Sequence, residues 1–130
     1  MAVSIPTILA VAGGGALGAV SRYGVGVAMG RWLGHGFPVA TLTVNIVGSF
    51  AMGVLIALLA HYGGGQTLRA FLAVGFLGAF TTFSAFSLDT ILLVERGQTG
   101  LAAIYVAGSV IGSVAGLFLG LHLIRQLVAS

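Results

Sequence analysis

The sequence contains no cysteine and no lysine, and it carries few charged residues of any kind. The absence of cysteine excludes disulfides and thiolate metal sites. Five arginines and two acidic residues are the only charged side chains, so charged residues make up 5% of the 130 residues. A typical soluble domain carries about 25%. This chain cannot cover a water-facing surface, and we predict that it lies in a lipid bilayer.

The scarcity of polar clusters excludes two further classes of function. The arginines are scattered along the chain, so no basic patch is available for nucleic acid. His35, His61 and His122 lie far apart and lack the spacing of metal ligands. Because no nucleophile–base pair or metal cluster is evident, we do not expect an enzyme.

Long apolar runs are the main feature that the sequence does contain. A membrane-spanning helix needs about 20 apolar residues, and the uncharged runs 1–21, 32–68, 70–88 and 97–124 suffice for four helices. We predict an all-α membrane protein with a single domain, residues 1–130, and transmembrane helices at about 3–30, 38–60, 68–95 and 99–126. The links are short, so neighbouring helices run antiparallel and both termini lie on one side.

The arginines are almost evenly divided between the two ends of this predicted bundle. Arg69 and Arg125 lie on the side of the termini, Arg31 and Arg96 lie on the other, and Arg22 is inside the first helix. Orientation in a membrane follows the asymmetry of basic residues in short loops. Two interpretations stay open: weak cues select one orientation, or copies insert both ways and pair as an antiparallel, dual-topology homodimer.

The stretch "GFLGAFTTFSAF", residues 75–86, predicts a break near the middle of the third helix. Residues 68–95 would span about 42 Å as one helix, beyond a hydrocarbon core of about 30 Å. Glycines weaken this helix, and Thr81 and Thr82 can compete for its backbone hydrogen bonds. A break would free carbonyls around residues 78–81, which are hard ligands suited to a small cation.

Two phenylalanines follow the predicted break. Phe83 and Phe86 are three residues apart and therefore share one face of the second half-helix. Ordinary packing would explain them. Alternatively, their positively polarised ring edges can contact a small anion without trapping it.

Polar residues at membrane depth are the other candidates for a transport path. Tyr105, Ser109 and Ser113 repeat every fourth residue, and Thr41 and Asn45 share a face of the second helix. Hydroxyls can bond back to their own helix, whereas the amide of Asn45 needs a partner elsewhere. Together with Ser84, these side chains would supply donors for an anion path.

Arg22 and Asp89 lie at similar depths from the same side, about 13 Å and about 10 Å by helical rise. They could form a structural ion pair. Alternatively, Arg22 could line a vestibule and raise the local anion concentration. The sequence leaves both possibilities open.

The segments "GFLGAFTTFSAFSLDT", "TLTVNIVGSF", "GALGAVSRY" and "YVAGSVIGS" resemble those of the Fluc/CrcB fluoride channels, and the resemblance covers essentially the whole chain. It implies a dual-topology homodimer with two antiparallel pores. Such channels export fluoride passively across the bacterial inner (plasma) membrane, surrounded by lipid. A minority of them pair two unlike chains.

The resemblance also implies a role for each matching residue. Main-chain carbonyls of Gly78 and Thr81 from both subunits would hold a central, structural Na⁺. Arg22 would belong to the vestibule, and the two rings of each pore would come from different subunits. The motif has Ala85 where many members carry threonine, which leaves the rings and threonines intact. Thr41 and Ser84, which come from the polar pattern alone, complete the expected set. The residues expected in the fluoride pore are Thr41, Asn45, Phe83, Ser84, Phe86, Tyr105, Ser109 and Ser113.

Two alternatives fit the sequence less well. A small multidrug-resistance transporter would need a membrane-embedded glutamate in helix 1, where Arg22 is the only charged residue. A packing subunit of a larger complex would explain the many glycines, but it would leave the break and the hydroxyls without a role.

Overall fold

The computed structural model describes residues 3–130, and all of its regular elements are helices. In chain order these are α1 (Ile5–Leu33), α2 (Val39–Tyr62), α3 (Gly65–Arg69), η1 (Ala70–Leu77), α4 (Gly78–Phe80), α5 (Phe83–Glu95) and α6 (Thr99–Ala129). Four segments are long and apolar enough to cross a membrane: Ile5–Leu33, Val39–Tyr62, Gly65–Glu95 and Thr99–Ala129. The prediction of an all-α protein with four long apolar helices, which fit a multi-pass membrane protein, is therefore confirmed.

Local sequence signals account for the ends of the long helices. The hydroxyl of Ser4 accepts a hydrogen bond from the amide of Thr7 at 3.3 Å and so caps the start of α1. Gly34 and Gly63 end α1 and α2 with φ angles of 74° and 79°, which glycine adopts without steric cost. These tight endings make the links short.

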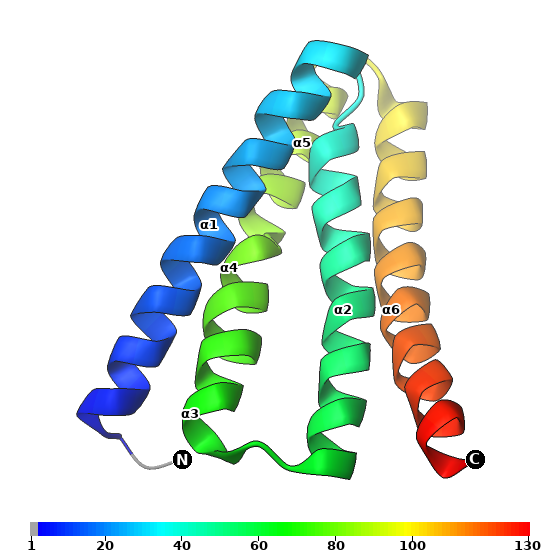
Figure 1. The fold of residues 1–130 in the computed structure, drawn as a ribbon. Coiled ribbons are helices and arrows are strands. Elements are labelled where there is room, and N and C mark those ends of the chain that lie inside the picture. Colours follow the sequence, from blue (N-terminus) through cyan, green and yellow to red (C-terminus); the bar gives the residue numbers. More distant parts are fainter. Residues whose placement is uncertain (1–2) are drawn as a thin grey trace.

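The bundle consists mainly of two helix pairs (Figure 1). α1 packs along η1 and α4, and α2 packs along α6. The two pairs come together toward the end opposite the chain termini, where α5 contacts α6. Both termini lie at the same end of the bundle (Figure 1), as expected from an even number of spans.

Glycines set the close approach within both pairs. A Cβ atom added to Gly14 or Gly18 would collide with backbone carbonyls of η1, those of Phe71 and Phe76. In the other pair, a Cβ on Gly120 would collide with the carbonyl of Phe50. Membrane helices gain no hydrophobic driving force from association, so such backbone contact is a main source of their packing energy.

The third span is not one continuous α-helix. η1 forms wide π-helical turns, α4 ends at Phe80, and α5 begins at Phe83. Between them, Thr81 and Thr82 have extended backbone, with ψ angles of 156° and 115°. The hydroxyl of Thr82 then accepts a hydrogen bond from the amide of Ala85 at 3.1 Å, which caps α5. The same threonine therefore ends the extended stretch and starts the next helix.

Candidate ion-permeation site

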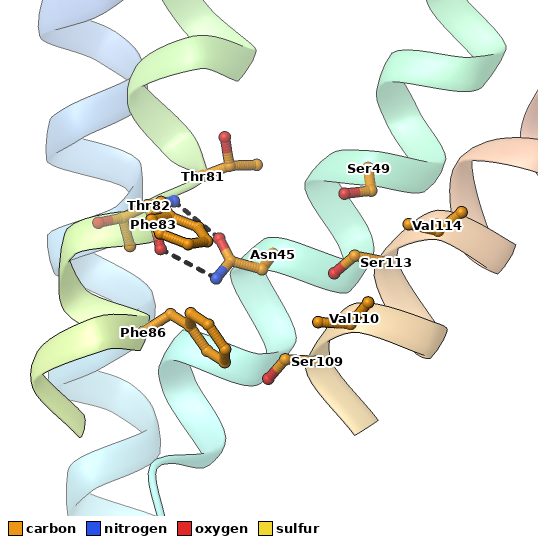
Figure 2. Close-up of a pocket in the computed structure, with 10 residues that line it drawn as sticks. All are labelled: Asn45, Ser49, Thr81, Thr82, Phe83, Phe86, Ser109, Val110, Ser113 and Val114. Carbon is orange, nitrogen blue, oxygen red and sulfur yellow. Dashed lines mark hydrogen bonds between the residues drawn. The ribbon is translucent and has the colours of Figure 1, made fainter. Parts of the chain in front are cut away.

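A groove of about 320 Å³ lies where the start of α5 faces α2 and α6 (Figure 2). It brings together five of the predicted pore residues, contributed by three separate helices. The residues that line it are Asn45, Ser49, Thr81, Thr82, Phe83, Phe86, Ser109, Val110, Ser113 and Val114.

Asn45 is anchored to the extended stretch rather than to its own helix. Its Nδ2 donates to the carbonyl of Thr82 at 3.0 Å, and its Oδ1 accepts from the amide of Thr82 at 2.7 Å. Figure 2 shows this pair of bonds spanning from α2 to the start of α5. A primary amide has two N–H donors, so these bonds leave one N–H of Asn45 for another acceptor.

The extended stretch also diverts two backbone donors from their normal acceptors. In an α-helix, the amide of Thr82 would serve the carbonyl of Gly78, and the amide of Ala85 would serve the carbonyl of Thr81. Here the amide of Thr82 donates to Asn45, and the amide of Ala85 donates to the Thr82 hydroxyl. The carbonyls of Gly78 and Thr81 thereby lose their α-helical donors.

The two phenylalanine rings form one wall of the groove. Their centroids are 5.4 Å apart, and the ring planes are tilted by 51°. Phe86 leans on the buried ring of Tyr105, with a centroid distance of 5.4 Å. Phe83 is 78% exposed in the single chain. One ring is therefore supported by the bundle, and the other stands at the open side of the groove.

Hydroxyls line the opposite wall. Ser109 is 5% exposed, and in the described part of the chain its Oγ has no hydrogen-bond partner. Ser113 lies one turn further along α6 (Figure 2). The groove also includes Ser49 of α2, which was not among the residues expected from the sequence. The signal was present, because Thr41, Asn45 and Ser49 repeat every fourth residue.

Three predicted pore residues do not line this groove. Tyr105 is fully buried, and its hydroxyl donates to Oδ2 of Asp89 at 3.0 Å. Ser84 is exposed, with its Oγ 3.2 Å from the Thr82 hydroxyl. Thr41 lines other cavities, on the side of the α1–α2 link. Tyr105 thus supports Phe86 from behind instead of facing the groove.

Arg22 and Asp89 each have a partner other than the one considered from the sequence. Nε of Arg22 donates to the carbonyl of Ala79 at 3.1 Å, whereas Asp89 accepts from Tyr105. Arg22 also lines a second cavity, of about 380 Å³, together with His35 and Thr41. The structure therefore gives no ion pair between Arg22 and Asp89 among residues 3–130.

Known proteins resemble this chain over nearly its full length. The profile of the family described as "CrcB-like protein, Camphor Resistance (CrcB)" matches residues 9–121. A protein from Rhodospirillum centenum, named fluoride-specific ion channel FluC, is 64% identical over 123 residues, which are 94% of this chain and 98% of the relative. A protein of the same name from Paracoccus denitrificans is 57% identical over 123 residues, which are 95% of this chain and 98% of that relative.

These matches cover nearly the full length of both partners, and they include all the segments that carry the resemblance. The relatives are named as channels and not as enzymes. The chain therefore belongs to the Fluc/CrcB family of ion channels.

Proposed function

We propose that this chain forms a fluoride-selective channel that lets F⁻ leave the bacterial cytoplasm passively across the inner membrane. Two relatives of more than half identity are named fluoride-specific ion channels. The groove supplies the chemistry that a small anion needs, because it combines ring edges with amide and hydroxyl donors. Its lining contains no acidic side chain, whereas rings of Asp or Glu are common in cation channels.

The observation that carries this proposal is that the groove has an open side in the single chain. Phe83 is 78% exposed although it belongs to the wall of the groove. A second copy in the opposite orientation would cover this open side and add its own wall. The even division of Arg69 and Arg125 against Arg31 and Arg96 allows both orientations. Two-fold symmetry would then give two antiparallel pores in each homodimer.

Within the groove, each group would replace part of the hydration shell of F⁻. Asn45 has one N–H left after its bonds to Thr82. The buried hydroxyl of Ser109 has no other partner in the described chain and can donate to the ion. Rings of Phe83 and Phe86 offer positive edges, which attract the anion weakly enough to release it.

The resemblance also implies a structural Na⁺ at the dimer axis, and the residues fit this ion. The amides that would normally bond the carbonyls of Gly78 and Thr81 are engaged elsewhere. Freed carbonyls in a membrane need a cation or another donor. Two copies of the pair would offer four hard oxygens. A bound Na⁺ would supply the positive charge that balances these carbonyls.

The proposal is tested by anion efflux from liposomes that contain the purified protein. We expect rapid release of fluoride and no release of chloride, monitored with ion-selective electrodes. Protein-free liposomes and liposomes with heat-denatured protein are the controls. Absence of fluoride flux from a monodisperse dimer would contradict the proposed function.

Replacing either phenylalanine ring of the groove is expected to slow fluoride efflux. Phe83→Ile and Phe86→Ile keep apolar bulk but remove the ring edge, and contacts that depend on the ring quadrupole are worth on the order of 1 kcal/mol. We expect efflux to fall about tenfold in each variant, with the dimer peak in size-exclusion chromatography unchanged. Phe118→Ile is the matched control, because Phe118 lies on α6 outside the groove and stacks on His122. Equal efflux from all three variants would exclude a role for the ring edges.

A further inference from the structure

Arg22 makes its hydrogen bond to the backbone of the interrupted span. It lies on α1, and its Nε donates to the carbonyl of Ala79, 57 residues away in sequence, at 3.1 Å. α1 and α4 pack against each other along this region. Asp89, the nearest acidic candidate by depth, accepts from Tyr105 instead. The guanidinium therefore links two spans through a main-chain oxygen and not through a carboxylate.

The position of this bond matters because it lies at the C-terminal end of α4. The last carbonyls of a helix lack intrahelical donors and carry partial negative charge, which a cation stabilises. Ala79 follows Gly78 directly and precedes Thr81 by two residues. The amides normally available to Gly78 and Thr81 serve Asn45 and Thr82 instead. Arg22 thus holds one of the two carbonyls that lie between the freed carbonyls of Gly78 and Thr81.

We infer that Arg22 is a positioning residue for the axial cation site, an inference that rests on the Na⁺ of the proposed function. By fixing the Ala79 carbonyl, Arg22 holds the end of α4 so that the carbonyls of Gly78 and Thr81 keep their direction. This role needs a donor at the position of Nε. It differs from attraction of anions into the vestibule, which needs only the positive charge.

Two neutral variants separate the donor from the charge. In Arg22→Gln, the side-chain Nε2 comes after the same number of bonds as Nε of arginine, so it can still donate to Ala79. In Arg22→Met, the atom at that position is a methyl carbon with no donor. Both variants lose the charge, so vestibule attraction predicts the same behaviour for both. Arg31→Gln, at the exposed end of α1, is the control for loss of one positive charge.

The primary readout is retention of radioactive Na⁺ by the purified dimer after gel filtration into potassium buffer. A hydrogen bond to a charged or partly charged group corresponds to about tenfold or more in an equilibrium constant. We expect Arg22→Met to need about tenfold more Na⁺ for half-maximal retention. For Arg22→Gln, the Na⁺ concentration for half-maximal retention should stay within about threefold of that for the unchanged protein. For Arg31→Gln, it should equal that of the unchanged protein.

A second readout is the thermal midpoint of the dimer in sodium and in potassium buffer. A purely structural role would lower the midpoint equally in both salts, whereas positioning of the cation site lowers the gain that Na⁺ provides. Equal Na⁺ dependence of the Gln and Met variants would overturn the inference, as would an unchanged protein that neither binds Na⁺ nor gains stability from it. Assembly of Arg22→Met only at high Na⁺ would support it, and failure to assemble at any Na⁺ concentration would contradict it.

The proposed function and this inference can fail separately. Retention of Na⁺ with the expected order of variants, but without fluoride efflux, would leave the positioning role standing and remove the channel. Normal fluoride efflux, with Na⁺ retention that does not change in Arg22→Met, would leave the channel standing and remove the positioning role of Arg22.

Discussion

Asn45→Asp is expected to abolish nearly all fluoride efflux while the protein remains in the membrane. The amide of Asn45 donates to the carbonyl of Thr82 and accepts from its amide. Aspartate keeps the acceptor, but it loses the donor and places a carboxylate oxygen against the Thr82 carbonyl. It also adds a negative charge to a groove that we propose carries F⁻. Together these effects cost about 3 kcal/mol or more, which corresponds to at least about 100-fold in rate.

The measurement is initial efflux from liposomes at equal protein density. Gln98→Glu makes the same change from amide to carboxylate, but at the exposed link before α6, where a negative charge near a helix start is tolerated. We expect this control to conduct normally. Efflux from Asn45→Asp within about threefold of the unchanged protein would show that the amide neither anchors Thr82 in the conducting state nor faces the ion.

Gly14→Ala is expected to prevent correct assembly of the bundle. Its Cβ would collide with the carbonyl of Phe71 and press on the amide of Phe76, both of which are backbone atoms of η1. Backbone cannot rotate away as a side-chain tip can, so α1 must separate from the third span. We expect a loss of about 2 kcal/mol or more in stability and a large fall in the yield of monodisperse dimer.

The neighbouring residue provides a matched control. A Cβ on Gly15 would lie 4.0 Å from its nearest neighbour, the carbonyl of Gly75, which is ordinary contact. Gly15→Ala also raises helix propensity to the same extent as Gly14→Ala, so the pair differs only in the collision. Thermal midpoints and dimer yields of the two variants should therefore diverge. Similar behaviour of both would mean that α1 does not pack against η1 as closely as in this structure.

Both predictions depend on the close packing of other helices around the interrupted third span. The interrupted span needs rigid surroundings, because side chains from other helices, Arg22 and Asn45, hold part of its freed backbone. Glycines bring α1 close enough for Arg22 to reach Ala79 and bring α2 close enough for Asn45 to reach Thr82. Packing over small residues therefore brings the helices close enough for these polar contacts to form.

Much about this protein follows from the sequence by itself. The scarcity of charge and the four apolar runs determine a membrane protein with four spans, because lipid excludes charged surfaces and requires helices of this length. The segment from Gly75 to Phe86, together with motifs of the other spans, indicated the family, and the match over residues 9–121 then showed it. Residues of one helix that share a face, such as Ser109 and Ser113, could also be grouped correctly.

Only the tertiary structure decided how those faces meet. Helical periodicity gives the angle of a residue around its own axis, but not the rotation of that helix against its neighbours. Tyr105 shares a stripe with Ser109, yet it is buried behind Phe86 and bonded to Asp89. Depth along the membrane likewise says nothing of lateral position, so Arg22 and Asp89 lie at similar depths but find different partners. A pattern of side chains does not predict a backbone acceptor such as the carbonyl of Ala79, because such a carbonyl becomes available only where a helix ends.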